Sequence, residues 1–177
     1  MVKTRGGPDA FYADEKLPLL GRDDIEALKL EIPRTTFGRT RLCAHQDVGD
    51  TLQEMFIVLS RETYIRPHQH VGKVESLLVL EGLAHAVFFD EDGQIVQTAR
   101  LGEYGSGHQF FYRIGEGIYH SLLIHSETLV FKEATVGPFD PAKTVFAPWA
   151  PDGRDGVTAS AYMADLAARA LSKGVSS

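Results

Sequence analysis

Short apolar segments separated by turn residues fill the middle of the chain. The run from Leu52 to Ser60, for example, has Met-Phe-Ile-Val-Leu at its centre and favours a buried strand, with a helical start as the alternative. Asp90 to Gly93 ends in Asp-Gly, the strongest short-range signal for a β-hairpin. We expect strands at 52–60, 63–70, 75–80, 83–89, 95–101, 110–114, 118–124 and 129–136. Their spacing of about ten residues predicts a mainly β sandwich or barrel.

The beginning of the chain has a different pattern. Residues 1–20 are mostly polar with scattered apolar side chains. They predict a loose arm, which could cover a neighbouring chain in a homodimer or could be disordered. Asp23 and Asp24 are candidate caps for a short helix that continues through Leu30.

The end of the chain combines an extended segment with a helix. The segment from Gly137 to Pro141 is expected to end the sheet. Trp149, between two prolines, is expected to anchor the tail by packing on the barrel. A helix is predicted at 157–171, with an apolar stripe formed by Met163, Leu166, Ala167, Ala170 and Leu171. The predicted divisions are an arm and short helix (1–33), a β-barrel (34–141), and a tail with a C-terminal helix packed on the barrel (142–177).

Composition narrows the class of protein. At 177 residues, a single domain is expected. Cys43 is the one cysteine, which excludes an intramolecular disulfide and fits a reducing compartment. The net charge of -6 argues against nucleic acid as a partner. The first residues do not resemble a signal peptide, and no run approaches the ~18 apolar residues that cross a bilayer. We therefore expect a cytoplasmic protein that binds neither nucleic acid nor membrane.

The stretch from Tyr64 to Gly82 carries the candidate chemistry. His68 and His70 are two residues apart, so on a strand both imidazoles point to the same face. Glu75 begins the next apolar run and can add a carboxylate from a neighbouring strand. Two imidazoles and a carboxylate suit a borderline divalent transition metal. The alternative is a solvated strand face with a surface carboxylate.

A third imidazole follows a later turn. Gly115 and Gly117 predict a tight turn, after which His120 could be the first inward residue of a strand. This residue would complete a set of three histidines and one glutamate.

The two spacings resemble the two cupin motifs. These are His68-x-His70-x4-Glu75-x6-Gly82 and Gly115-x-Gly117-x-x-His120. Three positions depart from the usual pattern: Glu62 replaces a leading glycine, Gly115 a proline, and Ile124 an asparagine. The leading glycine and the asparagine are not ligands, and glycine and proline both serve a turn. The departures therefore leave the metal site intact.

Alternation places further polar side chains beside this site. If His68 and His70 face inward, Tyr64 and Arg66 are expected on the same face. In the run from Arg39 to Cys43, the two end residues and Arg41 would also share one face of a strand. One of the arginines could meet an anionic substrate group, and exposure on the surface is the alternative.

Four further histidines are not expected to bind the metal. His85 lies on a predicted strand and could line the barrel. His45, His108 and His125 are expected to be exposed or to lie behind the ligands.

Several other segments resemble the WbuC family of cupin-fold metalloproteins. They are TYIRPHQH, FFDEDGQI, VGPFDP and APWAPDG, and the likeness covers roughly Arg34 to Leu171. The resemblance implies a cupin-type double-stranded β-helix, a jelly-roll barrel, around one divalent metal (iron, manganese, nickel or zinc). The implied ligands are His68, His70, Glu75 and His120. Analogy with the family places Glu133 inward and Lys132 outward, and the reverse assignment is possible.

These features predict a metal-dependent enzyme that acts on a small carbohydrate-derived molecule. The expected reaction is isomerisation or epimerisation of a sugar or nucleotide-sugar, because the resembled family is associated with bacterial surface-polysaccharide gene clusters. Tyr64 and Glu133 are the candidates for proton transfer, and Arg66 for holding a carboxylate or phosphate. An iron(II)-dependent dioxygenase and a non-catalytic barrel that binds a small ligand or regulates a partner are the alternatives.

Overall fold

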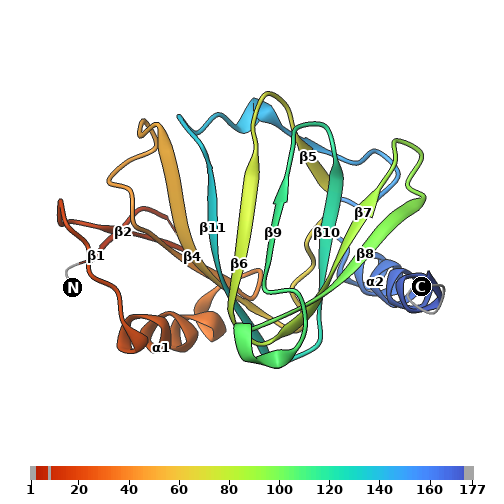
Figure 1. The fold of residues 1–177 in the computed structure, drawn as a ribbon, viewed down its shortest axis with the longest axis horizontal. Helices are drawn as coiled ribbons and strands as arrows, with labels where there is room; N and C mark the ends of the chain where they lie inside the picture. Colours follow the sequence, from red (N-terminus) through yellow and green to blue (C-terminus); the bar gives the residue numbers. More distant parts are fainter. Residues whose placement is uncertain (1–2, 8, 174–177) are drawn as a thin grey trace.

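Two β-sheets face each other in a computed structural model that describes residues 3–7 and 9–173 (Figure 1). The first sheet has seven strands, in the order β1 (Lys3–Arg5), β2 (Ala10–Ala13), β3 (Arg39–Cys43), β4 (Leu52–Ser60), β11 (Thr128–Val136), β6 (Glu75–Glu81) and β9 (Phe111–Ile114). The second has five, in the order β12 (Thr144–Phe146), β5 (His68–His70), β10 (Tyr119–Ile124), β7 (Leu83–Phe89) and β8 (Ile95–Gly102). The predicted mainly β jelly-roll barrel with a helix near each end is confirmed.

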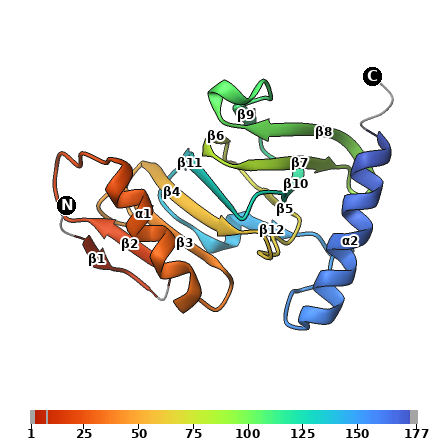
Figure 2. The same ribbon diagram turned by 90° about the horizontal axis from the view of Figure 1, so that it is seen from below.

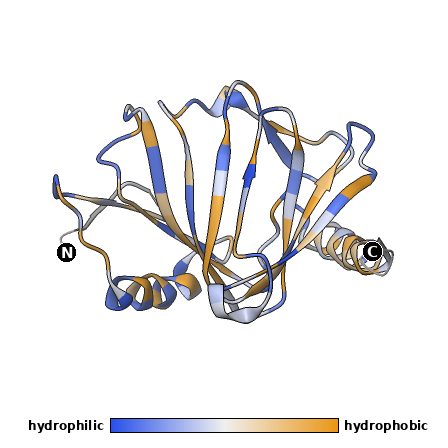
Figure 3. Ribbon diagram, in the orientation of Figure 1, coloured by the Kyte–Doolittle hydropathy of each residue, from blue (hydrophilic) through white to orange (hydrophobic). Residues whose placement is uncertain are grey.

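The core lies between the two sheets. Inward residues of both sheets form one cluster, which includes Leu77 and Val79 of β6, Ala86 of β7, Leu122 of β10 and Phe131 of β11. Figure 3 shows the change along β6, from hydrophilic colour at its start to hydrophobic colour over its middle. The apolar part closes one end of the barrel and leaves the start of β6 for polar side chains.

Most predicted strands agree with the structure, and β4 and β7 agree residue for residue. The strand predicted at 63–70 is wrong in its first half, because β5 covers only His68 to His70. Pro67 lacks a backbone N–H and stands directly before β5, so pairing starts after it.

The prediction of a loose N-terminal arm is also wrong. Strands β1 and β2 pair with each other, and β2 runs parallel to β3. The helix α1 (Arg22–Glu31) begins after Gly21, whose N–H donates to the Asp24 carboxylate at 3.0 Å, so neither Asp23 nor Asp24 is the cap residue itself. Figure 2 shows α1 lying across β3 and β4, where Leu28 is buried.

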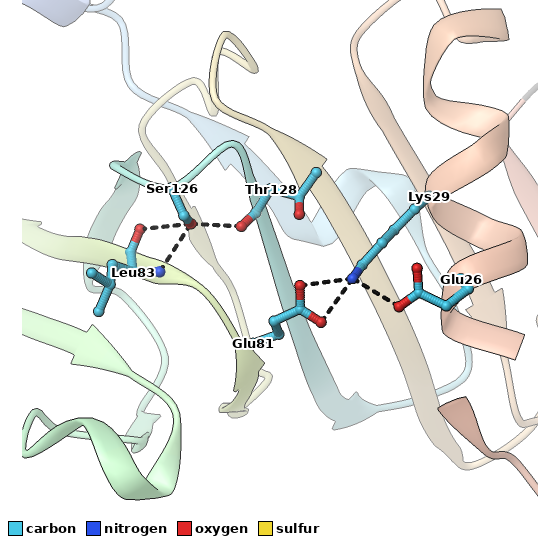
Figure 4. A network of polar contacts seen from close by, with 6 residues as sticks. All are labelled: Glu26, Lys29, Glu81, Leu83, Ser126 and Thr128. Carbon is cyan, nitrogen blue, oxygen red and sulfur yellow. Dashed lines mark hydrogen bonds and ion pairs between the residues drawn. The ribbon is translucent and has the colours of Figure 1, made fainter. Parts of the chain in front are cut away.

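Lys29 joins α1 to the end of β6 (Figure 4). Its Nζ lies 2.7 Å from both carboxylate oxygens of Glu81 and 3.0 Å from Glu26. Beside this ion pair, Ser126 Oγ accepts from the Leu83 N–H at 2.9 Å and donates to the Thr128 carbonyl. Between them lies the turn from β6 to β7.

Gly82, at that turn, is expected to tolerate no side chain. Its φ is +94°, and a Cβ there would collide with the Thr128 carbonyl oxygen and Ser126 Oγ. We expect Gly82→Ala to lower the free energy of unfolding by roughly 1–3 kcal/mol, measured by urea denaturation. Gly105→Ala is the control, because a Cβ at Gly105 meets nothing within 4 Å. Equal losses in the two variants would contradict this explanation.

The C-terminal segment adds both a strand and a helix. The prediction that the sheet ends at Pro141 is wrong, because β12 pairs with β5. Trp149 packs on Phe89 at a ring-centroid distance of 5.0 Å, as expected of a tail anchor. The helix α2 (Gly156–Lys173) packs beside β8, but Leu171 of the predicted stripe is 53% exposed. Tyr162 joins the packed face instead.

Candidate metal centre

Three histidines from two neighbouring strands converge in the barrel. His68 and His70 lie on β5, and His120 is the second residue of β10. β10 pairs with β5 antiparallel, with His120 opposite His68. One ring nitrogen from each of the three lies within 4.8 Å of the others. The predicted convergence of the three imidazoles is therefore present.

Hydrogen bonds orient two of these rings. His68 Nδ1 lies 2.9 Å from the Arg66 carbonyl oxygen, and His120 Nδ1 lies 3.0 Å from the Ile118 carbonyl oxygen. A carbonyl only accepts, so in each ring Nδ1 carries the proton and Nε2 keeps its lone pair. Metal-binding histidines commonly have this second-nitrogen contact.

Glu75 lies at the same place, from the first residue of β6. Its Oε2 is 3.0 Å from His70 Nε2, and its Oε1 is 3.7 Å from His120 Nε2. Burial alone would raise the pKa of the Glu75 carboxyl, but the hydrogen bond with His70 and the nearby imidazoles outweigh burial and lower that pKa. The carboxylate is therefore ionised at neutral pH, as a metal ligand must be.

The glycine turn at residues 115–117 connects the motif that contains His120 to the motif that contains His68 and His70. Gly117 has a φ of +76°, and its N–H donates to the His70 carbonyl at 2.9 Å. The Glu116 carboxylate accepts from the Gly72 N–H at 2.7 Å. The turn that leads to His120 is thus fixed directly to the end of β5.

The donor set fits a divalent transition metal. Three imidazoles and one carboxylate, with the rings held from behind, are a common ligand set for such ions. Burial, and next the neighbouring His120, lower the pKa of His68 to about 4, so its ring is neutral and can coordinate at neutral pH. The three histidines could hold one ion, and Glu75 lies within reach as a fourth ligand. This cluster supports the prediction of a metal cofactor.

A cavity of about 1230 Å³ extends from the histidines between the two sheets. Glu133 of β11 borders it, opposite Met55 of β4 and Leu77 of β6 in the sheet register. Lys132 points to the other face and pairs with Glu54 at 2.5 Å. Of the two assignments left open by the sequence, the inward Glu133 is the one observed. Burial, then the charge of Glu75, raise the pKa of Glu133 well above its ordinary value.

Tyr112 of β9 is a cavity residue that the sequence did not single out. It lies opposite Leu77 in the register, and burial, then the charges of Glu75 and Glu133, raise its pKa. Alternation along Phe111–Ile114 is compatible with either face pointing inward, and the pairing of β9 with β6 decides between the two.

Tyr64 and Arg66 border the cavity but are held by the tail. The Tyr64 hydroxyl donates to the Pro151 carbonyl at 2.9 Å, and burial, then Tyr162, raise its pKa to about 12. Arg66 Nη2 donates to the Ala147 carbonyl at 3.1 Å, while its Nε is buried without a hydrogen-bond partner among the described residues. Their contacts connect the segment before β5 to the C-terminal segment.

The remaining histidines are not part of the cluster, and His85 and His45 differ from expectation. His85 does not line the barrel, because its strand neighbours Ala84 and Ala86 do, and its Nδ1 lies 2.5 Å from His125 Nε2 outside it. His45 is 7% exposed, borders the cavity, and accepts from the Glu54 N–H at 3.0 Å.

In a comparison with protein families, one family model matches part of this chain. A family model described as "Domain of unknown function (DUF6016)" matches residues 22–101. Among curated proteins, none matches this chain. In the part of the chain that the structure describes, no helix is both long and apolar enough to cross a membrane.

Solved structures with a similar fold include protein SO0799 from Shewanella oneidensis, with a TM-score of 0.53 and 12% identity over 72% of this chain and 85% of that chain. Others are a point mutant of Bacillus subtilis oxalate decarboxylase (TM-score 0.45, 20% identity, 56% and 25% covered) and CapF with an inhibitor (0.47, 19%, 61% and 31%). This chain spans less than a third of the latter two. At 12% identity, the likeness to SO0799 is one of fold.

Proposed function

We propose that this chain is a metal-dependent cupin enzyme of the WbuC type that isomerises or epimerises a sugar or nucleotide-sugar. The observation that carries the proposal is the joint position of His68, His70, His120 and Glu75 at the wall of a large cavity. A structural zinc site is normally closed by its four ligands. A ligand set that borders about 1230 Å³ of open space has room for a substrate beside it.

Proton transfer is assigned to Glu133. A divalent metal bound by the four ligands would supply Lewis-acid polarisation of a substrate oxygen. Glu133 borders the same cavity, and its raised pKa means that its carboxyl holds a proton more strongly than an ordinary glutamate does, so it can serve as the acid and its conjugate base as the base. Tyr64 is the second candidate, and its hydroxyl would have to leave the Pro151 carbonyl before it reached a substrate.

Arg66 is proposed to contact an acidic part of the substrate. Its guanidinium lies over the Phe146 ring, 5.1 Å from the ring centroid, and its buried Nε has no hydrogen-bond partner among the described residues. The backbone carbonyl of Arg66 also accepts from His68, which ties this arginine to the position of a metal ligand.

The same ligand set supports a second candidate, an iron(II)-dependent dioxygenase. Three histidines and a glutamate suit iron(II) as well as zinc, nickel or manganese. The identity of the metal in protein purified without chelators or a histidine tag separates the two, together with oxygen uptake in an electrode.

The experiment that tests the isomerase is solvent exchange. Sugars, sugar phosphates and nucleotide-sugars are incubated in D₂O with metal-loaded protein, and deuterium incorporation at carbon is followed by proton NMR. Exchange into one substrate class is expected, and Glu133→Gln is expected to abolish it while retaining the metal. Metal-loaded protein that catalyses no exchange but consumes oxygen with a substrate would favour the dioxygenase. Metal-loaded protein with neither activity would leave a non-catalytic binding barrel.

A further inference from the structure

The inner face of β3 presents two arginines and the single cysteine to the cavity. Thr40 and Leu42 are 1% and 0% exposed, and Leu42 packs in the cluster beneath α1. Because side chains alternate along a strand, Arg39, Arg41 and Cys43 face the opposite side. All three border the cavity, so these arginines do not lie on the outer surface of the sheet.

The two arginines differ in their partners. Arg39 Nε donates to the Asp9 carboxylate at 2.9 Å. Among the side chains that the structure describes, those of residues 6–7 and 9–172, none forms a hydrogen bond or ion pair with the half-buried Arg41 side chain. Glu133 attracts it electrostatically, but the two are not paired. A guanidinium has five N–H donors. A guanidinium that borders a cavity and has no protein partner can therefore donate hydrogen bonds to a bound ligand.

Tyr12 and Cys43, which adjoin Arg41, carry no negative charge. Tyr12 of β2 lies opposite Cys43 in the sheet register, and Tyr12 contacts the His45 ring edge-on at a centroid distance of 5.6 Å. Burial raises the pKa of both the Tyr12 hydroxyl and the Cys43 thiol, so both remain neutral. Arg41 therefore contributes a positive charge to the cavity wall that neither of these two groups offsets.

Arg41 lies across the cavity from the metal ligands. β3, which carries it, is separated from β6, which carries Glu75, by β4 and β11. At about 4.8 Å per strand, the two backbones are roughly 14 Å apart. Both side chains extend into the same cavity and shorten this distance. A small molecule can therefore reach the histidine cluster with one end and Arg41 with the other.

We propose that Arg41 binds an acidic group of the ligand, a phosphate or a carboxylate, at the end of the cavity opposite the histidine cluster. A guanidinium binds either group through two parallel N–H donors. The proposal deepens the proposed function and rests on it for the sugar at the other end of the ligand. The substrate class becomes an acidic sugar derivative, either phosphorylated or carboxylated, and neutral sugars are disfavoured.

Binding of small anions to metal-free protein tests Arg41 directly. Inorganic phosphate is followed by phosphorus NMR and malonate by carbon NMR, each titrated with chelator-treated protein. Arg41→Gln is expected to raise the Kd of the bound probe about tenfold or more, because a charge-assisted hydrogen bond is lost. Arg34→Gln is the matched control and should leave the Kd unchanged, because Arg34 pairs with Glu31 on the far side of β3 and is 70% exposed.

Each outcome has a defined meaning. Preference for phosphate or for malonate identifies the acidic group. Wild-type protein that binds neither probe, or that binds them no better than Arg41→Gln, would overturn the assignment. If circular dichroism shows that Arg41→Gln does not fold, Arg41→Lys is used instead. This variant keeps the charge but loses the two parallel N–H donors, and an unchanged Kd would also overturn the assignment. The absence of metal separates this result from failure of the proposed function, which the exchange experiment decides.

Discussion

His70→Ala is expected to reduce the metal content from about one ion per chain to a small fraction of that value while the barrel stays folded. His70 Nε2 lies 3.0 Å from Glu75 Oε2, so this ring and this carboxylate act on the same point. Loss of one ligand from such a set removes a bond to the metal and also the partner that keeps Glu75 ionised. Elemental analysis of purified protein gives the measurement, and Glu75→Gln and His120→Ala should behave alike.

The control for this experiment is His85→Ala. His85 is also a half-buried strand histidine near another histidine, but it lies outside the barrel. Its replacement should leave the metal content unchanged. Metal retained by His70→Ala at the wild-type ratio would exclude ligation by His70. Equal losses in His70→Ala and His85→Ala would indicate a general effect of losing a histidine.

The site was predictable from sequence where its geometry is local. His68 and His70 share a face because side chains two residues apart on a β-strand point to the same side. Gly117 fixes the turn before His120 through its positive φ. Glu75 is placed at the start of a strand whose apolar run is evident in the sequence. These side chains are positioned by elements of fewer than ten residues each, so their spacing contains the necessary information.

Features that depend on distant partners were not predictable in the same way. β2 forms a strand because it pairs in parallel with β3. β12 forms a strand because it pairs with the edge of β5. Tyr64 and Arg66 lie beside the site, but their polar ends are taken by carbonyls of Pro151 and Ala147, more than eighty residues later. Glu133 required the register of β11 against both neighbours.

The metal-free protein is expected to lose stability on mild acidification, in part through His68. This ring has a pKa of about 4 in the folded state and an ordinary value of 6.5 when unfolded. At a pH between these two pKa values, His68 is protonated in the unfolded chain and neutral in the folded chain, so acid favours unfolding. The stabilisation is complete above pH 6.5 and is lost as the pH falls toward 4. The difference corresponds to roughly 3 kcal/mol of unfolding free energy.

Urea denaturation of chelator-treated protein between about pH 7.5 and 4 measures this effect against His68→Gln. Glutamine does not titrate, so the difference between the two stability profiles gives the contribution of His68. Glu75, His120, His85 and His125 also have lowered pKa values, and their contributions to the loss of stability in acid are common to both proteins. Parallel profiles would contradict the prediction. Saturating metal should move the wild-type loss to lower pH, because a bound ion competes with the proton for the same nitrogen, and should leave the His68→Gln profile nearly unchanged.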